Sequence, residues 1–417
     1  MSSSVAAALF LSLAVLLVLA RVLGLVTSRL FQPLVVGEIA TGVLLGPTFL
    51  PASVGARLFP AEVRPILSGL ANIGVALFMF GVGREFDQGM ARRLARPVVA
   101  MALFTVLVPL GLGVLTALLL VRRHQADNQV AFVAFVGVAM SITAFPVLAR
   151  ILDERRLTGT AIGRLALTGA AVNDMLAWIA LIFVIALAGA SSSPWRLLAL
   201  IPYVALLILL TPVLRRLRDN PDPSFVRMVL LFAGLALSCW MTEWVGLHFI
   251  FGAFLFGLVL APKRRDAGES EPPDFLMRLA KLTAPILLPV YFVVAGLRVD
   301  LSGFSSRDVA DLLLILVVAI GGKVVGGFVG ARFCGVRGRP ALLMGILLNA
   351  RGLTELVVLG VGLDAGLLDP RLYSSMVVMA LITTAMTGPF VKLLESRGLV
   401  LAEAGNAIAD PELVGRP

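Results

Sequence analysis

Asn173 and Asp174 stand side by side in the stretch TGAAVNDMLAW, whose other residues are mostly apolar or small. A carboxylate surrounded by hydrocarbon is costly and by default marks a functional site. Three roles are open for Asp174: a structural residue that is permanently paired or protonated, a relay for protons alone, or a site where a cation and a proton compete. We favour the third role, because Ser141 and Thr143 lie next to a predicted helix break at Pro146. Hydroxyls and freed carbonyls are the oxygen ligands that hard cations prefer.

Competition between a cation and a proton has a simple physical basis. Burial in a medium of low dielectric disfavours the charged form of a carboxylate, whereas nearby positive charge favours it. A carboxylate held between these two effects can release a proton and take up a cation in its place. If the protein reorients only when one or the other is bound, the two ions are exchanged obligatorily.

Three further charges within apolar segments are expected to compensate this carboxylate. Lys323 lies among glycines in AIGGKVVGGFVGARF, and we expect its ammonium to face the core, although such a side chain can also reach a membrane interface. Arg351 and Glu355 in NARGLTEL are four residues apart, so they share a helix face and can pair. The alternative for this pair is a purely structural contact between helices.

Two more polar residues lie in the apolar segments. Asn173 is rotated by about 100° from Asp174 around a helix, so we expect its amide to brace the broken helices rather than to share the face of the carboxylate. Glu38, in QPLVVGEIATGVLLGP, is another acid among apolar residues. A structural role near a glycine bend is at least as well supported for Glu38 as a role in transport.

The composition indicates a polytopic membrane protein. The chain has 417 residues, of which 59% are hydrophobic and 14% charged, and its mean hydropathy is +0.99; soluble domains carry about 25% charged residues. Thirteen apolar segments approach the ~20 residues that a helix needs to span a bilayer. They are residues 5–27, 33–51, 66–83, 97–121, 129–151, 161–189, 195–214, 226–243, 246–261, 282–297, 309–332, 341–364 and 372–394.

The basic residues predict the orientation of these spans. With the N-terminus outside, 25 of the 35 lysines and arginines fall in the inner loops and tail and 8 in the outer loops. The remaining two are Lys323 and Arg351. This asymmetry satisfies the positive-inside rule and places the C-terminus in the cytoplasm. The net charge of +10 therefore reports topology, and no nucleic-acid partner is expected.

Two segments have interrupted helical patterns at corresponding positions. Residues 129–151 contain Pro146, and residues 341–364 contain a cluster of polar and small residues, NARGLTE. They are seven spans apart, so they cross the membrane in opposite directions. Broken helices at matching places in inverted halves point to the binding site of a transporter.

These observations predict an all-α polytopic membrane protein of about thirteen transmembrane helices, built from inverted repeats with two crossed discontinuous helices. The expected parts are an extra N-terminal transmembrane helix (1–28), a first inverted repeat (29–190), linking helices (191–245), a second inverted repeat (246–396) and a short cytoplasmic tail (397–417).

The run SITAFPVLARILDERRLTGTAIGRLALTGAAVNDMLAW, together with QPLVVGEIATGVLLGP and LLNARGLTELVVLGVGLDAGLL, resembles the monovalent cation:proton antiporter superfamily. Bacterial Na⁺/H⁺ and K⁺/H⁺ exchangers and plant cation/H⁺ exchangers are similar to it over nearly the whole chain. The resemblance implies a sodium/proton antiporter fold and a homodimer. In each subunit, a mobile core domain would carry two crossed, unwound helices and move like an elevator.

The resemblance also implies roles for single residues. Asp174 matches the essential ion-binding aspartate, and Thr143 falls in the unwound segment beside the ion. Asn173 matches a position that is aspartate in many electrogenic exchangers and asparagine in many electroneutral ones. Lys323 matches the lysine that pairs with that aspartate in electrogenic exchangers, so this chain keeps the lysine without its usual partner. We therefore expect one-for-one exchange, with Asp174 as the single proton carrier.

The prediction for function is a secondary active antiporter that exchanges Na⁺ or K⁺ for H⁺ across the cytoplasmic membrane. No enzymatic activity and no cofactor are expected, and Asp174 is the expected ligand of the transported cation. A passive cation channel, or an organic-ion exporter or sodium symporter on a related scaffold, is the alternative.

Overall fold

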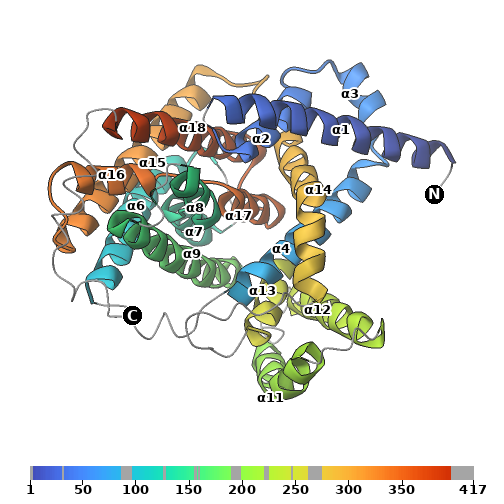
Figure 1. Cartoon of the computed structure of the whole chain (residues 1–417). Coiled ribbons are helices and arrows are strands. Elements are labelled where there is room, and N and C mark those ends of the chain that lie inside the picture. Colours follow the sequence, from blue (N-terminus) through green and yellow to red (C-terminus); the bar gives the residue numbers. More distant parts are fainter. Residues whose placement is uncertain are drawn as a thin grey trace. The chain divides into compact units, whose positions relative to one another are not determined.

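The computed structural model describes residues 3–30, 32–85, 96–124, 128–154, 157, 160–188, 199–219, 225–245, 248–261 and 275–395 (Figure 1). In these ranges all regular secondary structure is helical, which confirms the predicted fold class. The helices are α1 (Ser3–Arg29), α2 (Leu34–Leu45), α3 (Ala52–Leu58), α4 (Arg64–Glu85), α6 (Arg96–Leu120), α7 (Gln129–Ser141), α8 (Phe145–Glu154), α9 (Ala161–Leu187), α11 (Leu200–Asp219), α12 (Phe225–Val245), α13 (Phe249–Val259), α14 (Phe275–Leu297), α15 (Ser306–Phe333), α16 (Arg339–Leu347), α17 (Leu353–Asp364) and α18 (Pro370–Glu395).

Each of the thirteen predicted apolar segments coincides with one helix or with a broken pair of helices. Within the described ranges, nine helices are long and apolar enough to cross a membrane: α1, α4, α6, α9, α11, α12, α14, α15 and α18. The other four segments are the shorter helices α2 and α13 and the pairs α7–α8 and α16–α17. The short helix α3 was not predicted; its residues include none that is buried.

The chain divides into two compact units, each assembled from three separate stretches. Unit 1 comprises Met1–Leu17, Leu58–Arg92 and Ile185–Val294, and unit 2 comprises Val18–Arg57, Arg93–Val184 and Ala295–Pro417. The predicted limits of the two inverted repeats follow the chain order instead, and they stay a prediction.

Unit 1 is held together by close contacts between backbones. A Cβ atom at Gly83 of α4 would lie 2.1 Å from the carbonyl oxygen of Phe254 in α13, and one at Gly257 would lie 2.2 Å from that of Phe80. Small residues of this kind permit close helix approach in membranes. α12 packs against α13 on the same principle, since a Cβ at Gly252 would lie 2.1 Å from the carbonyl oxygen of Ser238.

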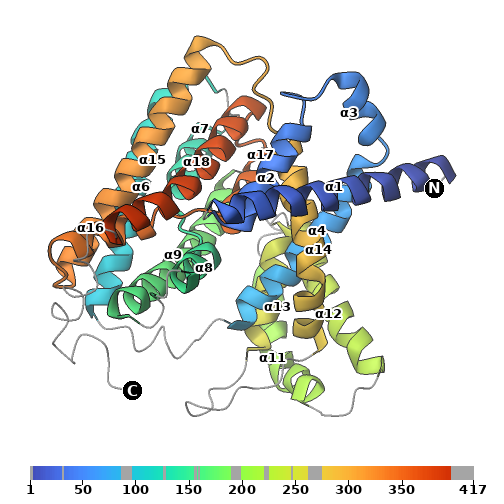
Figure 2. The ribbon, with the colours of Figure 1, turned by 45° about the horizontal axis from the view of Figure 1, so that its top comes forward.

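Unit 2 contains the two broken pairs, and α15 is a central support for them. α15 packs against α6, α16 and α18, and Figure 2 shows α6 and α15 running side by side. The contact between α15 and α16 is made at Gly327 and Gly345: a Cβ at Gly327 would lie 2.6 Å from the Cα of Gly345. Nothing larger than hydrogen fits between these two helices at that point.

Both predicted interruptions are present in unit 2. The first break covers Ile142–Ala144, between α7 and α8, and the second covers Leu348–Gly352, between α16 and α17. Pro146 is the second residue of α8, a position where its missing N–H costs no helical hydrogen bond. At Gly352 the backbone is extended (φ 178°), a conformation that any residue can adopt. Glycine is favoured there for lack of space, because a Cβ would lie 2.4 Å from Cγ2 of Val147.

The contact between α15 and α16 predicts the effect of one added methyl group. Gly327→Ala should destabilise the protein by about 1–3 kcal/mol, because the new Cβ overpacks the backbone of α16. The measurement is the thermal unfolding midpoint of the purified protein. Gly321→Ala is the matched control on the same helix, where no atom lies within 4 Å of the added Cβ. An equal loss in both variants would contradict the proposed contact.

Candidate ion-binding site

The two breaks lie against each other and exchange hydrogen bonds. The N–H of Ala144 in the first break donates to the carbonyl oxygen of Ala350 in the second (3.1 Å). The hydroxyl of Thr143 donates to the carbonyl oxygen of Leu348 (3.0 Å). The four ends of the half-helices α7, α8, α16 and α17 therefore converge on one place, as the interrupted patterns predicted.

Asn173 of α9 braces the first break, as expected from the sequence. Its Oδ1 accepts a hydrogen bond from the N–H of Thr143 (3.0 Å). Its Nδ2 donates to the carbonyl oxygens of Ser141 (3.2 Å) and Thr105 (3.5 Å). The side chain is fully buried, so its amide replaces the backbone partners that the break removes.

Asp174 contacts the chain directly after this break. Its Oδ2 accepts a hydrogen bond from the N–H of Phe145 (3.1 Å), the first residue of α8. A helix N-terminus carries partial positive charge and favours an anion there. Asp174 is 8% exposed, and its Oδ1 has no hydrogen-bond partner within the described part of the chain. One carboxylate oxygen is thus fixed, and the other is available to a proton or a cation.

The expectation that Asn173 and Asp174 serve different faces of α9 is consistent with their separate partners. Asn173 contacts the backbone at Thr143 in the first break, and Asp174 contacts the N–H of Phe145 at the start of α8.

The carboxyl end of α7 presents four carbonyls beyond its regular helical hydrogen bonds, and each has a side-chain partner; the carbonyl of Ala139 also accepts from the N–H of Ile142 (3.4 Å). Ser141 Oγ donates to the oxygen of Val138 (2.7 Å). The three remaining acceptors are served by buried cations and an amide: Ala139 by Arg351 Nη1 (3.2 Å), Met140 by Arg351 Nη2 (2.9 Å), and Ser141 by Lys323 Nζ and Asn173 Nδ2. Positive charge therefore meets the negative end of the helix dipole.

Lys323 of α15 is fully buried, so the predicted core location is correct. Its ammonium donates to the carbonyl oxygens of Ser141 and Thr105 (3.3 Å for Thr105) and to the hydroxyl of Thr143 (2.6 Å). None of these three partners is a carboxylate. The ammonium occupies a set of oxygen ligands much as a monovalent cation would.

Ser141 and Thr143 present oxygen in different ways. The hydroxyl of Ser141 is used inside α7, so the carbonyl of this residue, rather than its side chain, faces Lys323. The hydroxyl of Thr143 accepts from Lys323 while it donates to Leu348. Both residues therefore belong to the site, although Ser141 contributes through its backbone.

Arg351 and Glu355 form the predicted pair, with Arg351 Nη1 2.5 Å from Glu355 Oε1 and both side chains fully buried. Arg351 lies in the second break rather than within the helix. Sequence analysis missed Thr384 of α18, whose hydroxyl accepts from the N–H of Arg351 (3.1 Å) and lies 2.8 Å from its carbonyl oxygen. A threonine in an apolar helix gives no signal of such a role, because hydroxyls there usually bond to their own helix.

Several buried polar atoms around the second break have no hydrogen-bond partner in the described residues: Arg351 Nε, Glu355 Oε2, Asn349 Oδ1 and Thr354 Oγ1. Buried polar groups are normally satisfied by protein or by ordered water. Asp174 Oδ1 is a further buried oxygen of this kind, next to the start of α8.

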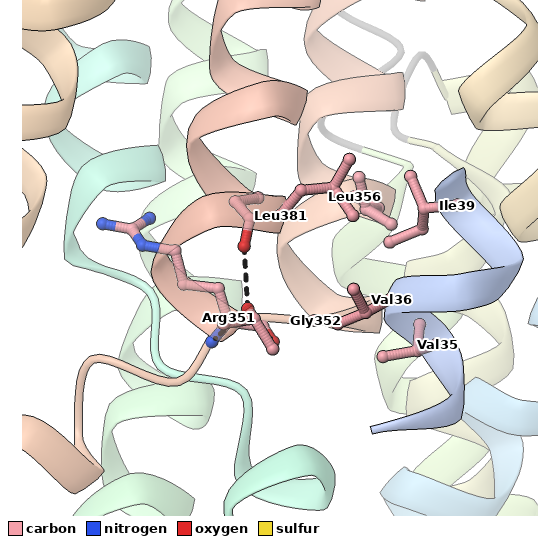
Figure 3. A pocket seen from close by; sticks show the side chains of 9 residues that line it. Val35, Val36, Ile39, Arg351, Gly352, Leu356 and Leu381 are labelled. Carbon is pink, nitrogen blue, oxygen red and sulfur yellow. Dashed lines mark hydrogen bonds between the residues drawn. The ribbon is translucent and has the colours of Figure 1, made fainter. Parts of the chain in front are cut away.

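A small pocket lies next to the second break, between α2, α17 and α18. Val35, Val36 and Ile39 of α2 face Leu356 and Leu381 across it (Figure 3). Arg351 and Gly352 form part of the wall, but the guanidinium of Arg351 points away from the α2 side chains. The pocket is therefore apolar, and the charge of Arg351 is directed toward α7.

Glu38 lies in α2 and is half-buried rather than fully buried. Its role in transport or in structure stays a prediction.

Comparison with known proteins identifies relatives along almost the whole chain. The family model described as "Sodium/hydrogen exchanger, transmembrane" matches residues 13–394. The Na(+)/H(+) antiporter NhaS4 of Synechocystis sp. is 34% identical over 392 residues, which cover 90% of this chain and 94% of the relative.

Eukaryotic relatives are longer. Cation/H(+) antiporter 17 of Arabidopsis thaliana is 35% identical over 410 residues, which cover 95% of this chain and 49% of the relative. The K(+)/H(+) antiporter 1 of Saccharomyces cerevisiae is 33% identical over 387 residues, 88% of this chain and 44% of the relative. This chain thus spans about half the length of these eukaryotic relatives.

Among solved structures, that of the sodium proton antiporter MjNhaP1 from Methanocaldococcus jannaschii at pH 8 is similar in fold. The TM-score is 0.61 at 16% sequence identity, and the match covers 95% of this chain and 98% of the other. The likeness confirms the predicted antiporter fold.

The buried pair in the second break predicts a strong dependence of stability on Arg351. Arg351→Met should destabilise the protein by about 3–5 kcal/mol, because Glu355 is left as an uncompensated buried charge. The added change Glu355→Gln should recover part of the loss, since it removes that charge. Unfolding midpoints of the two single variants and the double variant give the coupling. A double variant no more stable than Arg351→Met would show that the pair contributes little.

A carboxylate at position 173 should stabilise the protein. Asn173 Nδ2 and Lys323 Nζ bind the same carbonyls of Thr105 and Ser141, so Asn173→Asp places negative charge beside the ammonium while Thr143 keeps its acceptor. We expect a higher unfolding midpoint. Asn173→Ala is the control and should cost about 1–3 kcal/mol, because the buried N–H of Thr143 loses its partner. A loss of stability in both variants would argue against a direct effect of Lys323.

Proposed function

Because this chain belongs to the sodium/hydrogen exchanger family, we propose that it exchanges a monovalent cation, Na⁺ or K⁺, for H⁺ across the cytoplasmic membrane. Its relatives include a Na⁺/H⁺ antiporter and a K⁺/H⁺ antiporter. The observation that carries the proposal is the state of Asp174: one oxygen is fixed at the N-terminus of α8, and the other is buried with no hydrogen-bond partner among the residues that the structure describes.

The chemistry at Asp174 follows from this geometry. A proton on Oδ1 neutralises the carboxylate, and a cation at the same oxygen also neutralises it, so the two ions compete for one position. A cation there lies close to the first break, whose oxygens are held by Lys323. The cation therefore competes with the ammonium for Ser141 O and Thr143 Oγ1. Positive charge on Lys323 favours the unprotonated carboxylate and so assists release of the proton.

We propose one-for-one exchange, because Asn173 cannot titrate and Asp174 is the one carboxylate that contacts the first break in the described part of the chain. The hydrogen bonds that join the two breaks to each other and to Asn173, Asp174 and Lys323 are all made within unit 2. This supports an elevator-type cycle in which unit 2 is the mobile core of each subunit of a homodimer. The distribution of basic residues supports a multi-pass orientation with the N-terminus outside and the C-terminus in the cytoplasm.

Asp174→Asn should abolish exchange, because the amide neither titrates nor carries the charge that attracts a cation. It can still accept from the N–H of Phe145, so the unfolding midpoint should remain close to that of the wild type. The measurement is dissipation of an imposed pH gradient in proteoliposomes on addition of Na⁺, K⁺, Li⁺ or Rb⁺ in turn, with the membrane voltage clamped. The control is Asp364→Asn, a change at an exposed carboxylate paired with Arg298, which should leave exchange intact.

The same assay separates the proposal from its alternatives. A passive channel would carry cation current without moving protons. An organic-ion exporter or a sodium symporter on this scaffold would leave the pH gradient unchanged when Na⁺ or K⁺ is added. Full exchange by Asp174→Asn would remove this residue from the mechanism.

A further inference from the structure

A second titratable cluster in unit 2 lies where the ends of α6, α15 and α18 meet. His124 follows the last turn of α6 and is 8% exposed. Its Nδ1 shares a hydrogen bond with Asp369 Oδ2, just before α18. Its Nε2 lies 3.8 Å from Asp311 Oδ2 of α15, is buried, and has no hydrogen-bond partner in the described ranges. A single imidazole therefore stands between two carboxylates.

The charges around His124 come from all three elements. Arg123, the preceding residue, pairs with the other oxygen of Asp311. On α15, Asp308 interacts with His124 electrostatically and pairs with Arg371 of α18 (3.4 Å). Arg123 and Arg371 thus offset part of the negative charge of Asp311 and Asp308. One additional proton on the ring of His124 would change the net charge of this cluster.

Asp369 remains charged where histidine titrates. Burial raises the pKa of this carboxyl, but its hydrogen bonds with His124 and with the N–H groups of Leu372 and Arg371 outweigh burial and hold the pKa below the usual value. Between pH 5 and 8, the range in which histidine ordinarily changes charge, Asp369 is therefore a fixed acceptor for Nδ1.

The number of N–H donors on the imidazole decides whether His124 can form hydrogen bonds with both carboxylates. A neutral ring has one N–H and one lone pair, whereas a protonated ring has two N–H groups. With Nδ1–H directed at Asp369, the lone pair of Nε2 faces an oxygen of Asp311. No hydrogen bond can form there, which agrees with the 3.8 Å separation and the unsatisfied nitrogen. A proton on Nε2 converts this contact into a charge-assisted hydrogen bond, the stronger kind.

We propose that His124 is a second proton-binding site, distinct from Asp174, whose occupancy fastens the ends of α6, α15 and α18 to one another. The same three helices carry the partners of the ion site: Thr105 on α6, Lys323 on α15 and Thr384 on α18. Asp311 precedes Lys323 by twelve residues, or about 18 Å along a helix. In the proposed orientation His124 faces the outside, where it binds protons from the external medium.

The first test measures protonation directly. The full-length His248→Gln variant retains His124 as its one histidine, since the chain has two. Nitrogen-15 labelling of histidine then reports the ring of His124 by NMR. Nε2 should carry a proton at pH 5.5 and none at pH 8, and Asp311→Asn should reduce the protonated fraction at pH 5.5. A ring that stays neutral at pH 5.5, or that is unaffected by Asp311→Asn, would overturn the proposal.

The second test measures how much protonation of His124 stabilises the contacts between these helix ends. His124→Gln keeps a neutral donor for Asp369 but cannot gain a second charge-assisted bond. Its unfolding midpoint should be lower than that of the wild type by about 2–4 °C at pH 5.5 and equal to it at pH 8. His248→Gln is the matched control and should follow the wild type at both values. An unchanged midpoint in His124→Gln at pH 5.5 would overturn the proposal. Neither readout requires transport, so failure here leaves the proposed exchange untouched, and loss of exchange leaves this site untouched.

Discussion

Ends of helices buried in a membrane must find hydrogen-bond partners inside the protein, because no water is present to replace them. This constraint organises the whole of unit 2. The carbonyls at the end of α7 are met by Arg351 and Lys323, and the amide at the start of α8 is met by Asp174. The charged residues are thus sorted by the polarity of the helix end that each one faces. Among the described residues, the same sorting leaves one oxygen of Asp174 without a hydrogen-bond partner, and the proposed exchange places the proton or the cation there.

Lys323 and Asn173 together satisfy the carbonyl oxygens beside the first break, one with a charged group and the other with a neutral one. Both donate to the carbonyls of Ser141 and Thr105. The asparagine contributes no charge, so the ammonium of Lys323 contacts the carbonyl oxygens of Ser141 and Thr105 and the hydroxyl of Thr143 instead of a carboxylate at position 173. The binding carboxylate then changes state without an adjacent acid that also titrates, which is the physical basis for the proposed stoichiometry.

Much of this arrangement could be predicted from sequence, because its signals are local. Pro146 and the polar cluster NARGLTE mark the two breaks, and the spacing of Arg351 and Glu355 gives their pair. Two of the three partners of Lys323 could not be predicted, since they are carbonyls, which every residue possesses and which only packing selects. Thr384 was missed because a threonine hydroxyl in an apolar helix usually bonds to its own helix, and only packing brings this one to Arg351. The neighbours of His124 lie 187 and 245 residues away along the chain, so no local pattern brings them together.

The contact between Gly327 and Gly345 has a consequence for the specificity of the site. Lys323 is one turn from Gly327 on α15, and the second break begins three residues after Gly345. The distance between α15 and α16 at this point is therefore set by backbone atoms in direct contact. Under the proposed exchange, Na⁺ and K⁺ need oxygen ligands at distances that differ by fractions of an ångström, and so close a backbone contact allows little adjustment of that spacing. A side chain at Gly327 or Gly345 would move Lys323 relative to the second break, and with it the oxygen atoms that both of them hold.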